Sequence, residues 1–309
     1  MSGPALLLEG VTRRFGRKTA VDRLDLQVPQ GEVLGLLGRN GAGKTTLLRL
    51  ATGVLWPDGG SIRTLGLDPV TQGLQVRARA SLLAEESALY PWMTVGQIVS
   101  FAAALSKTWD RALARDLVRK LDLEEKAKIK TLSRGTRAKV SLLLAVATRP
   151  SLLLLDDPTS GLDPLVRREV LETLLETVVG EGGSVLYASH LIGDVERIAD
   201  SVAVLDRGRL ALEGNLEAMK ARTARLTAVF AERAGVPQQI PGALDVRVEG
   251  RILIVVSAEA DPAEAAIRAM GPERLEREPL PLEEILVAQL RGGRAESSSP
   301  ASAREVVHG

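Results

Sequence analysis

The chain has 309 residues, of which 45% are hydrophobic and 26% charged, a composition typical of a globular protein with one large and one small domain. Its formal net charge is +1, so the whole molecule has no strong electrostatic attraction to nucleic acid or to an anionic membrane. It contains no cysteine, which excludes disulfides and thiolate metal sites, and no uncharged apolar run reaches the roughly 18 residues of a membrane helix.

The chain begins without a signal-peptide pattern, because residues 1–4 include no basic residue and no long apolar core follows them. We therefore expect a cytoplasmic protein that reaches a membrane only through a partner. Strands are predicted at Leu6–Leu8 and Leu24–Val28. Between them lies Phe15, which could stack on an adenine ring, a contact worth about 1–3 kcal/mol in nucleic-acid sites, or could simply pack between strands.

The stretch from Gly38 to Thr46 has the spacing G-x-x-x-x-G-K-[ST] of a phosphate-binding loop. The apolar run 32–37 before it is typical of a buried parallel strand, and residues 47–51 after it are typical of a helix start. Strand, glycine loop and helix in that order are the context that this motif requires. The residues predicted to bind the phosphates are Gly38, Arg39, Asn40, Gly41, Ala42, Gly43, Lys44, Thr45 and Thr46.

The chemistry of this loop suits a nucleoside triphosphate with Mg²⁺. Gly38, Gly41 and Gly43 allow backbone conformations that a Cβ would forbid, so that backbone N–H groups can converge on phosphate oxygens. The N-terminus of the following helix adds its positive dipole end. Lys44 brings a full positive charge to the outer phosphates, and Thr45 offers a hydroxyl to Mg²⁺.

The next part of the chain predicts a helical insertion in an α/β domain. Two more strands are predicted at 61–65 and 80–84, and the second leads into a loop that carries Glu85. A helix is predicted at 94–105, where a capping box marks its start. Another is predicted at 109–121, where leucines recur every four residues.

After the insertion, helices and strands alternate again. A helix is predicted at 139–148 and ends at an Arg-Pro pair. The buried strand that follows, 152–157, finishes with Asp156 and Asp157. The end of such a strand points into the ligand crevice of a parallel α/β sheet.

Three further elements complete the large domain. Asp163 is followed by a proline, and this N-cap and N1 pair predicts a helix that extends to about residue 179. The strand predicted at 184–188 is followed by His190. A hairpin is predicted at 201–212 from its turn residues.

Beyond residue 222 the pattern changes to that of a small α+β unit. Strands are predicted at 226–230, 243–248 and 251–257, and helices at 262–270 and 282–291. The last residues are rich in serine, glycine and alanine, which predicts disorder. The predicted parts are therefore a large domain at 1–222, a small α+β domain at 223–291 and a disordered tail at 292–309.

Several motifs agree in order and spacing with one family. Residues 132–136, L-S-R-G-T, are similar to the signature L-S-G-G-Q, and residues 157–163 read D-P-T-S-G-L-D. With the phosphate-binding loop, and with His190 where the family has its switch histidine, residues 5–222 resemble the ATP-binding subunit of an ABC transporter. The resemblance implies an α/β P-loop NTPase with a parallel sheet core, an antiparallel β subdomain and a helical subdomain. Residues 89–95 resemble the subgroup that serves separate ABC-2 or export-type permeases.

The resemblance also implies a mechanism. Two ATP-binding domains meet head to tail; Lys44 and Thr45 would hold phosphate and Mg²⁺ from one side, while Ser133 and Gly135 would cap the γ-phosphate from the other subunit. ATP would then form part of a homodimer or heterodimer interface, and its hydrolysis would release that interface and drive a bound integral-membrane permease. The implied location is the cytoplasmic face of the cell membrane, with no nucleic-acid partner.

Several positions in this family pattern have specific expectations. Asp157 stands where the family has the glutamate that polarises the attacking water, and its side chain is shorter by roughly 1.5 Å. Because a general base supplies roughly 10²–10⁴-fold in rate, we predict a slow but real ATPase. Glu85 stands where the family has a glutamine that reaches Mg²⁺; a carboxylate can also ligate Mg²⁺, or it can be a surface acid. Arg134 and Thr136 depart from the signature.

The remaining candidates each have two interpretations. Asp156 is expected to assist Mg²⁺ through water, or to cap a helix. His190 is expected to contact the γ-phosphate, or to cap the end of its strand. Asp163 is expected to organise the dimer interface while it also caps a helix.

Three functions compete at this point. The first is a transport ATPase that powers a separate permease. The second is an ABC-type ATPase acting on nucleic acid or ribosomes, which the neutral charge and the absence of a second ATP domain disfavour. The third is an ATP-gated regulatory subunit with a slow or degenerate hydrolytic site.

Overall fold

The computed structural model describes residues 3–84, 89–232 and 240–297, so Glu85 lies outside the described residues. The chain divides into two compact units, Met1–Glu213 and Gly214–Gly309. This boundary differs from the one predicted at residue 222, because helix α8, Leu216–Arg222, packs against helix α10 of the second unit. Within the described ranges, no helix has the length and apolarity needed to cross a membrane.

A six-stranded sheet forms the centre of the first unit, with the strand order β5-β6-β7-β3-β8-β9. Its strands are β3 Val33–Leu37, β5 Ala80–Leu83, β6 Leu152–Asp156, β7 Ser184–Ser189, β8 Ser201–Asp206 and β9 Arg209–Asn215. The pairs from β5 through β8 are parallel, and the central strands are buried on both faces, which explains their continuous apolar sequences. The carboxyl ends of β3, β6 and β7 therefore lie at one edge, where the predicted site residues follow them.

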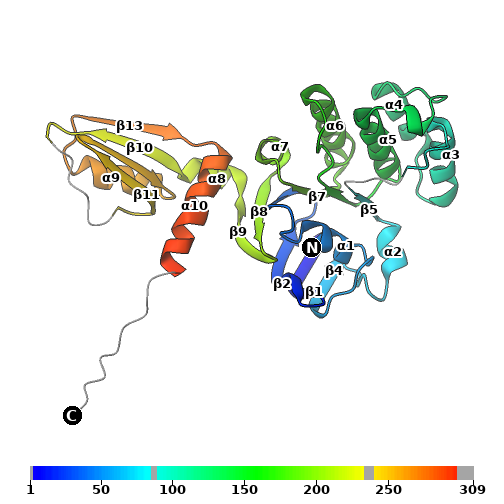
Figure 1. The fold of residues 1–309 in the computed structure, drawn as a ribbon, viewed down its shortest axis with the longest axis horizontal. Helices are drawn as coiled ribbons and strands as arrows, with labels where there is room; N and C mark the ends of the chain where they lie inside the picture. Colours follow the sequence, from blue (N-terminus) through cyan, green and yellow to red (C-terminus); the bar gives the residue numbers. More distant parts are fainter. Residues whose placement is uncertain (1–2, 85–88, 233–239, 298–309) are drawn as a thin grey trace, which may run out of the picture. The chain divides into compact units, whose positions relative to one another are not determined.

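A second, antiparallel sheet of the first unit has the order β2-β1-β4, with β1 at Leu6–Phe15, β2 at Lys18–Val28 and β4 at Gly59–Thr64. The first strand is longer than predicted and carries Phe15 as its last residue. Helix α1, Lys44–Ala51, contacts β4 and β2 of this sheet and β6 of the parallel sheet (Figure 1). One hydrophobic core of leucines and valines thus includes both sheets and α1.

Several helices surround the sheets of the first unit. In chain order after α1 they are α2 Gly73–Arg77, α3 Val95–Leu105, α4 Arg111–Lys120, the 3₁₀ helix Ile129–Thr131, α5 Arg134–Val146, α6 Pro164–Thr177 and the 3₁₀ helix Val179–Glu181. Helix α5 contacts β5, α3, α4 and α6, while α7, Ile192–Ile198, packs against β3 and β7. The capping box predicted at Thr94 is confirmed, with Thr94 and Gln97 bonded reciprocally. Helix α5 begins earlier than predicted, because the Ser133 hydroxyl caps it by accepting the Thr136 N–H.

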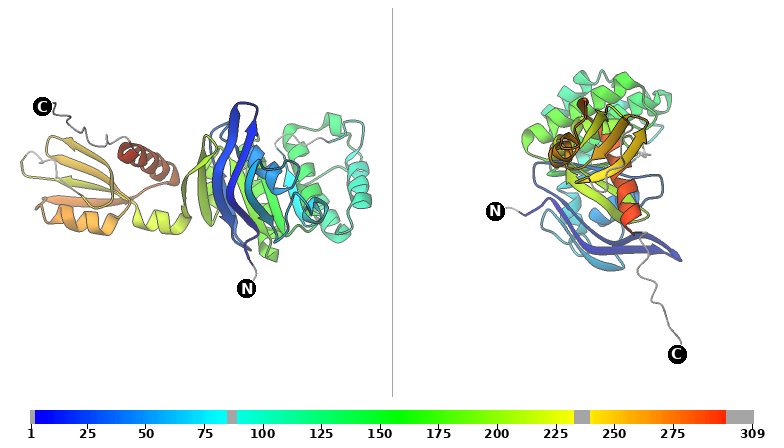
Figure 2. Two further views of the ribbon diagram at one scale, coloured as in Figure 1. Left: turned by 90° about the horizontal axis from the view of Figure 1, so that it is seen from below. Right: turned by 90° about the vertical axis from the view of Figure 1, so that its left-hand side faces the viewer.

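The second unit is a four-stranded antiparallel sheet with helices. Its order is β11-β12-β10-β13, with strands β10 Ala224–Val229, β11 Ala243–Glu249, β12 Ile252–Ser257 and β13 Arg274–Pro279. Helices α9, Ala260–Arg268, and α10, Leu282–Ser297, lie on opposite faces of this sheet (Figure 2). Helix α10 continues past the predicted limit at residue 291. The prediction missed β13, because its charged sequence lacks an apolar alternation, as is common for edge strands.

The end of α1 depends on Gly53. The Gly53 N–H bonds to the Leu50 carbonyl and the Val54 N–H to the Arg49 carbonyl, which is a Schellman motif with Gly53 at φ 68°. A Cβ at Gly53 would lie 2.2 Å from the backbone oxygen of Pro69, whereas at Gly66, with φ 77°, it would meet open space.

We predict that Gly53→Ala destabilises the first unit more than Gly66→Ala does. Both substitutions place alanine at positive φ, which costs about 1–2 kcal/mol, but only Gly53→Ala adds a backbone collision. Urea unfolding would measure both variants. Equal losses of stability would contradict the collision.

Candidate functional site

Residues 38–43 of the phosphate-binding motif connect β3 to α1, and residues 44–46 form the first turn of α1, in the order the motif requires. Gly43 is the N-cap of α1 with φ 115°, and a Cβ there would lie 2.4 Å from the carbonyl oxygen of Ala20. The first turn of α1 contains no acidic residue. Backbone N–H groups and the positive end of the helix dipole therefore face the loop without a competing carboxylate on that turn.

A cavity of about 300 Å³ opens above this loop. It is lined by Phe15, Lys18, Ala20, Arg39, Asn40, Gly41, Ala42, Gly43, Lys44, Thr45, Thr46 and Asp157. The structure therefore brings the predicted phosphate-binding residues that follow Gly38 together with Phe15 and Asp157. Because this cradle has backbone donors, a lysine and an open cavity beside them, its residues fit a nucleoside triphosphate.

The amine of Lys44 is buried within the loop. Its Nζ donates to the Gly38 carbonyl at 2.7 Å and lies 3.7 Å from Oδ2 of Asp157, and the residue is 5% exposed. A buried cation needs such partners, because burial without them would be costly. The lysine is thus held beside the carboxyl end of β6, where it can face an incoming phosphate.

Asp157 follows β6 in a left-handed conformation, with φ 45°. Its N–H donates to the Ala188 carbonyl at 2.8 Å, and its Oδ1 accepts from the Ser189 hydroxyl at 3.1 Å and from the His190 N–H at 3.0 Å. The same Oδ1 lies 2.7 Å from Nδ1 of His190. Because an ionised carboxylate only accepts, Nδ1 carries a proton, and Nε2 is the ring atom left for a further partner.

His190 lies on a second side of the phosphate-binding loop. With Asp206, Arg207 and residues 39–42 it lines a cavity of about 520 Å³. Its side chain is 39% exposed, so it is accessible while its Nδ1 stays bonded to Asp157. The structure thus places Asp157 between the Lys44 amine and the His190 ring, at 3.7 Å and 2.7 Å.

The candidate metal ligands Thr45 and Asp156 differ in how exposed they are. Thr45 is exposed in the cavity above the loop, and Asp156 is buried at the end of β6, paired in register with Ala188. Within the described ranges, no group of three or more His, Asp or Glu side chains could hold a metal by itself. A hydroxyl, a carboxylate and phosphate oxygens fit Mg²⁺, which keeps several waters and uses few protein ligands.

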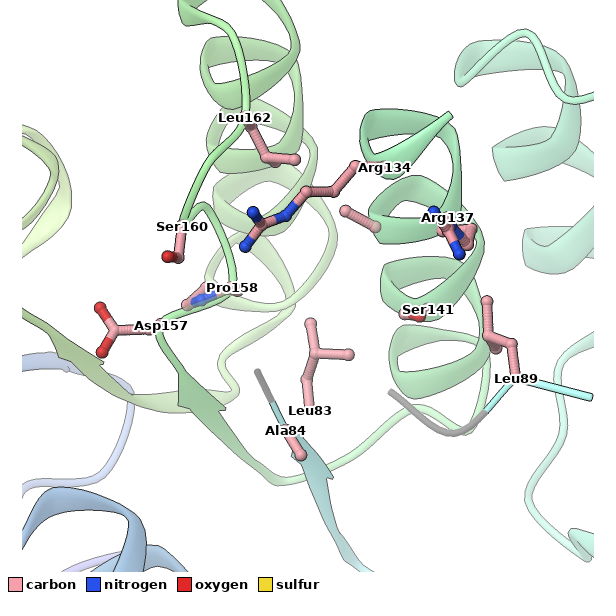
Figure 3. Close-up of a pocket in the computed structure, with 11 residues that line it drawn as sticks. Leu83, Ala84, Leu89, Arg134, Arg137, Ser141, Asp157, Pro158, Ser160 and Leu162 are labelled. Carbon is pink, nitrogen blue, oxygen red and sulfur yellow. The ribbon is translucent and has the colours of Figure 1, made fainter. Parts of the chain in front are cut away.

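The signature residues lie at the start of α5 and outside the cavity of the phosphate-binding loop. Ser133 is the N-cap, and a Cβ at Gly135 would lie 3.2 Å from Val166 of α6, so the two helices approach closely there. The side chain of Arg134 extends toward the loop that carries Ser160 (Figure 3). Its guanidinium lies against Gly161, where a Cβ would be 2.3 Å from Nη1.

Arg134 and Asp157 line a third cavity of about 420 Å³. Its other lining residues are Leu83, Ala84, Leu89, Arg137, Ala138, Ser141, Pro158, Ser160 and Leu162. Asp157 therefore lines both this cavity and the cavity at the phosphate-binding loop.

The surroundings of Phe15 and Asp163 bear on the two interpretations given for each residue. Phe15 is 45% exposed at the cavity, with the guanidinium carbon of Arg13 4.9 Å from its ring centroid. Asp163 is confirmed as the N-cap of α6, since its Oδ1 accepts from Leu165 N at 3.1 Å and Val166 N at 3.0 Å.

The sequence did not predict a buried polar cluster formed by Thr159, Tyr187 and Asp194. The hydroxyl of Thr159 lies 2.9 Å from the hydroxyl of Tyr187 and donates to Oδ2 of Asp194 at 2.5 Å. Burial raises the pKa of the Tyr187 phenol well above its ordinary value, so this hydroxyl keeps its proton. The only sequence signal was a tyrosine inside an otherwise apolar strand.

Comparison with known proteins agrees with this geometry. The family model described as ABC transporter matches residues 21–160. The daunorubicin resistance ATP-binding protein DrrA3 of Streptomyces coeruleorubidus is 36% identical over 228 residues, which are 72% of each chain. The spermidine/putrescine import ATP-binding protein PotA of Pseudomonas aeruginosa (strain UCBPP-PA14) is 32% identical over 289 residues, 89% of this chain and 79% of that one.

A solved structure has the same architecture. The structure described as the ATP binding subunit of an ABC transporter superposes with a TM-score of 0.64 at 26% identity and covers 70% of this chain and 92% of that one. Residues 21–160, which the family model matches, include the phosphate-binding loop and the strand that ends at Asp156. The chain therefore belongs to the family of ATP-binding subunits of ABC transporters.

Proposed function

We propose that this protein binds ATP with Mg²⁺, hydrolyses it, and uses the cycle to power transport through a separate membrane-spanning permease. The observation that carries the proposal is the convergence of Lys44, Asp157 and His190 on the cavity walls around one phosphate-binding loop. The resemblance of residues 89–95 and the resistance named for DrrA3 favour export, although PotA, named for import, is also similar.

The residues of the loop would hold the nucleotide. Residues 39–46 would bind the phosphates through backbone N–H groups and the Lys44 amine, and Phe15 would stack on the adenine with its solvent-facing side. Thr45 and Asp156, with Glu85, would hold Mg²⁺ directly or through water. When bound, Mg²⁺ would neutralise charge that develops on the phosphate oxygens.

Asp157 would act as the base that orients the attacking water. Its Oδ1 already accepts from Ser189 and His190, and its Oδ2 faces Lys44. These contacts hold the carboxylate close to the sheet edge. The short side chain would then reach the attacking water poorly, which supports a slow ATPase. His190 would donate from its remaining ring nitrogen to the γ-phosphate.

Ser133 and Gly135 would act on a different ATP molecule. They lie at the N-terminus of α5 and do not line the cavity of their own phosphate-binding loop. This separation supports a head-to-tail homodimer or heterodimer in which each α5 caps the γ-phosphate held by the partner. Asp163, at the start of the neighbouring α6, would organise the same interface.

A cluster of exposed aromatic side chains supports a membrane partner. Tyr90 packs against Trp92 with ring centroids 5.2 Å apart and against Phe101 at 5.7 Å. The three residues are 39%, 67% and 40% exposed, in that order. Because contiguous exposed apolar surface marks interaction sites, this cluster would receive the permease at the cytoplasmic face of the membrane.

The alternative function is an ATP-gated regulatory subunit. It is favoured by the same short side chain at Asp157, if the carboxylate remains bonded to His190 when ATP is present. Release of phosphate from ATP separates the two functions, because a gated subunit would bind ATP without turnover.

Lys44→Ala tests whether ATP hydrolysis depends on the phosphate-binding loop. We expect loss of phosphate release by at least about 100-fold, because the charge beside the transferred phosphate is removed. The matched control is Lys107→Ala, which removes an exposed lysine on the loop between α3 and α4. A Lys44→Ala variant as active as the control would refute the proposed role of this loop.

Asp157→Glu tests whether side-chain length limits the rate. We expect kcat to rise by about tenfold or more, since a base in better reach of the water can supply up to roughly 10²–10⁴-fold, whereas Asp157→Asn should lower it by about 100-fold. Phosphate release at saturating ATP and Mg²⁺ measures both.

Equal rates for the natural protein and Asp157→Glu would show that length does not matter. Absence of turnover in both would favour the regulatory alternative. With ATP and Mg²⁺, the slow Asp157→Asn variant should also elute as a dimer, and a monomer would contradict the shared-ATP interface.

Trp92→Ala tests the aromatic cluster. We expect recovery of a multi-span membrane protein from detergent-solubilised membranes to fall by about tenfold or more, because buried aromatic side chains dominate interface energies. The control is Leu74→Ala, which truncates an 82% exposed side chain on α2. Equal recovery with both variants would place the docking surface elsewhere.

A further inference from the structure

The backbone conformation of Asp157 is one that surrounding contacts must stabilise. Its φ of 45° lies in the left-handed region, which is strained for a residue other than glycine. Such a conformation persists only where the surrounding structure determines it. The contacts of Asp157 with Ala188, Ser189 and His190 provide part of that support, but they involve only the first residue of the loop.

Thr159 provides a second point of attachment for the same loop. It is fully buried, and its hydroxyl donates to Oδ2 of Asp194 at 2.5 Å and accepts from the Tyr187 hydroxyl at 2.9 Å. The oxygen of the Tyr187 hydroxyl also lies 3.3 Å from Oδ2 of Asp194, the longer of its two contacts. Tyr187 precedes Ala188 on β7, and Asp194 lies on α7 after His190. One segment, 187–194, therefore binds both Asp157 and Thr159.

The carboxylate of Asp194 has its own polar and charged partners. Asp194 is 5% exposed, and its Oδ1 lies 3.6 Å from Nη1 of Arg167 on α6. The same guanidinium donates to the Leu162 carbonyl at 3.4 Å through Nη2. The Asp194 carboxylate thus has the Thr159 hydroxyl as a donor, the Tyr187 hydroxyl close by and a cation, and the loop is also held at Leu162.

We propose that Thr159 is a positioning residue for Asp157: through Tyr187 and Asp194, its hydroxyl fixes the loop 157–162 to the segment 187–194. Asp157 and His190 then keep their contact and move as one unit. The consequence for catalysis rests on the proposed function, in which Asp157 acts in ATP hydrolysis; the structural consequence does not.

The test compares threonine variants at two buried positions. Thr159→Val removes the hydroxyl and keeps the shape, while Thr159→Ser keeps the hydroxyl. Thr173→Val is the matched control, because Thr173 is also fully buried and its hydroxyl has no hydrogen-bond partner in the described part of the chain. We expect Thr159→Val to lower kcat by about tenfold with KM for ATP changed by less than about twofold, since small misplacements of a reacting group reduce rates strongly. Thr159→Ser and Thr173→Val should stay within about twofold of the natural protein.

A second readout needs neither ATP nor turnover. The chain has two histidines, so ¹⁵N NMR can follow the His190 ring once His308 is replaced by glutamine. At a pH where the imidazole is neutral, the natural protein should hold its proton on Nδ1, against Asp157. Thr159→Val should reduce that preference, whereas Thr173→Val should not.

These readouts separate the two proposals. If the natural protein does not hydrolyse ATP, the proposed function fails while the His190 spectrum still decides the role of Thr159. If Thr159→Val does not fold, Tyr187→Phe removes a hydroxyl from the same group and should change the His190 signal in the same direction. Unchanged kcat together with an unchanged His190 spectrum in folded Thr159→Val, or in folded Tyr187→Phe where Thr159→Val does not fold, would overturn the proposal.

Discussion

The carboxylate of Asp157 joins three parts of the site that are distant in the sequence. It lies 3.7 Å from the amine of Lys44 after β3 and 2.7 Å from the ring of His190 after β7, while its own backbone follows β6. These three neighbours meet because β6, β7 and β3 are adjacent parallel strands whose carboxyl ends share one edge. A buried carboxylate at such an edge needs donors and a counter-charge; Ser189 and His190 supply the donors, and Lys44 supplies the counter-charge.

The packing around this edge explains why it can hold buried charge. Helix α1 lies between the parallel and the antiparallel sheet, and its first residue is Lys44, so the position of the lysine follows from a large apolar contact. On the far side, α7 packs on β3 and β7 and carries Asp194 into the interior. The polar groups are therefore placed by apolar surfaces that lie beside them, and little freedom remains to the loop between Asp157 and Asp163.

The two units of the chain pose different problems of prediction. In the first, the central strands β3, β6 and β7 are buried on both faces, and their apolar runs are evident in the sequence. In the second, β13 is an edge strand made mostly of charged residues, and Arg277 on it pairs with Asp261 of α9. Its identity as a strand depends on pairing with β10, which no local pattern reports.

The sequence by itself determined the phosphate-binding loop, the family, the central strands and the helix caps at Thr94 and Asp163, because each depends on local spacing or on residue type. It also placed Lys44, Asp157 and His190 among the candidates. Only the tertiary structure decided that Asp157 is left-handed, that Nδ1 of His190 faces it, and that Thr159 reaches Tyr187 and Asp194. Those contacts join residues about 30 positions apart in the sequence, and strand order and helix packing bring them together, which a one-dimensional pattern does not encode.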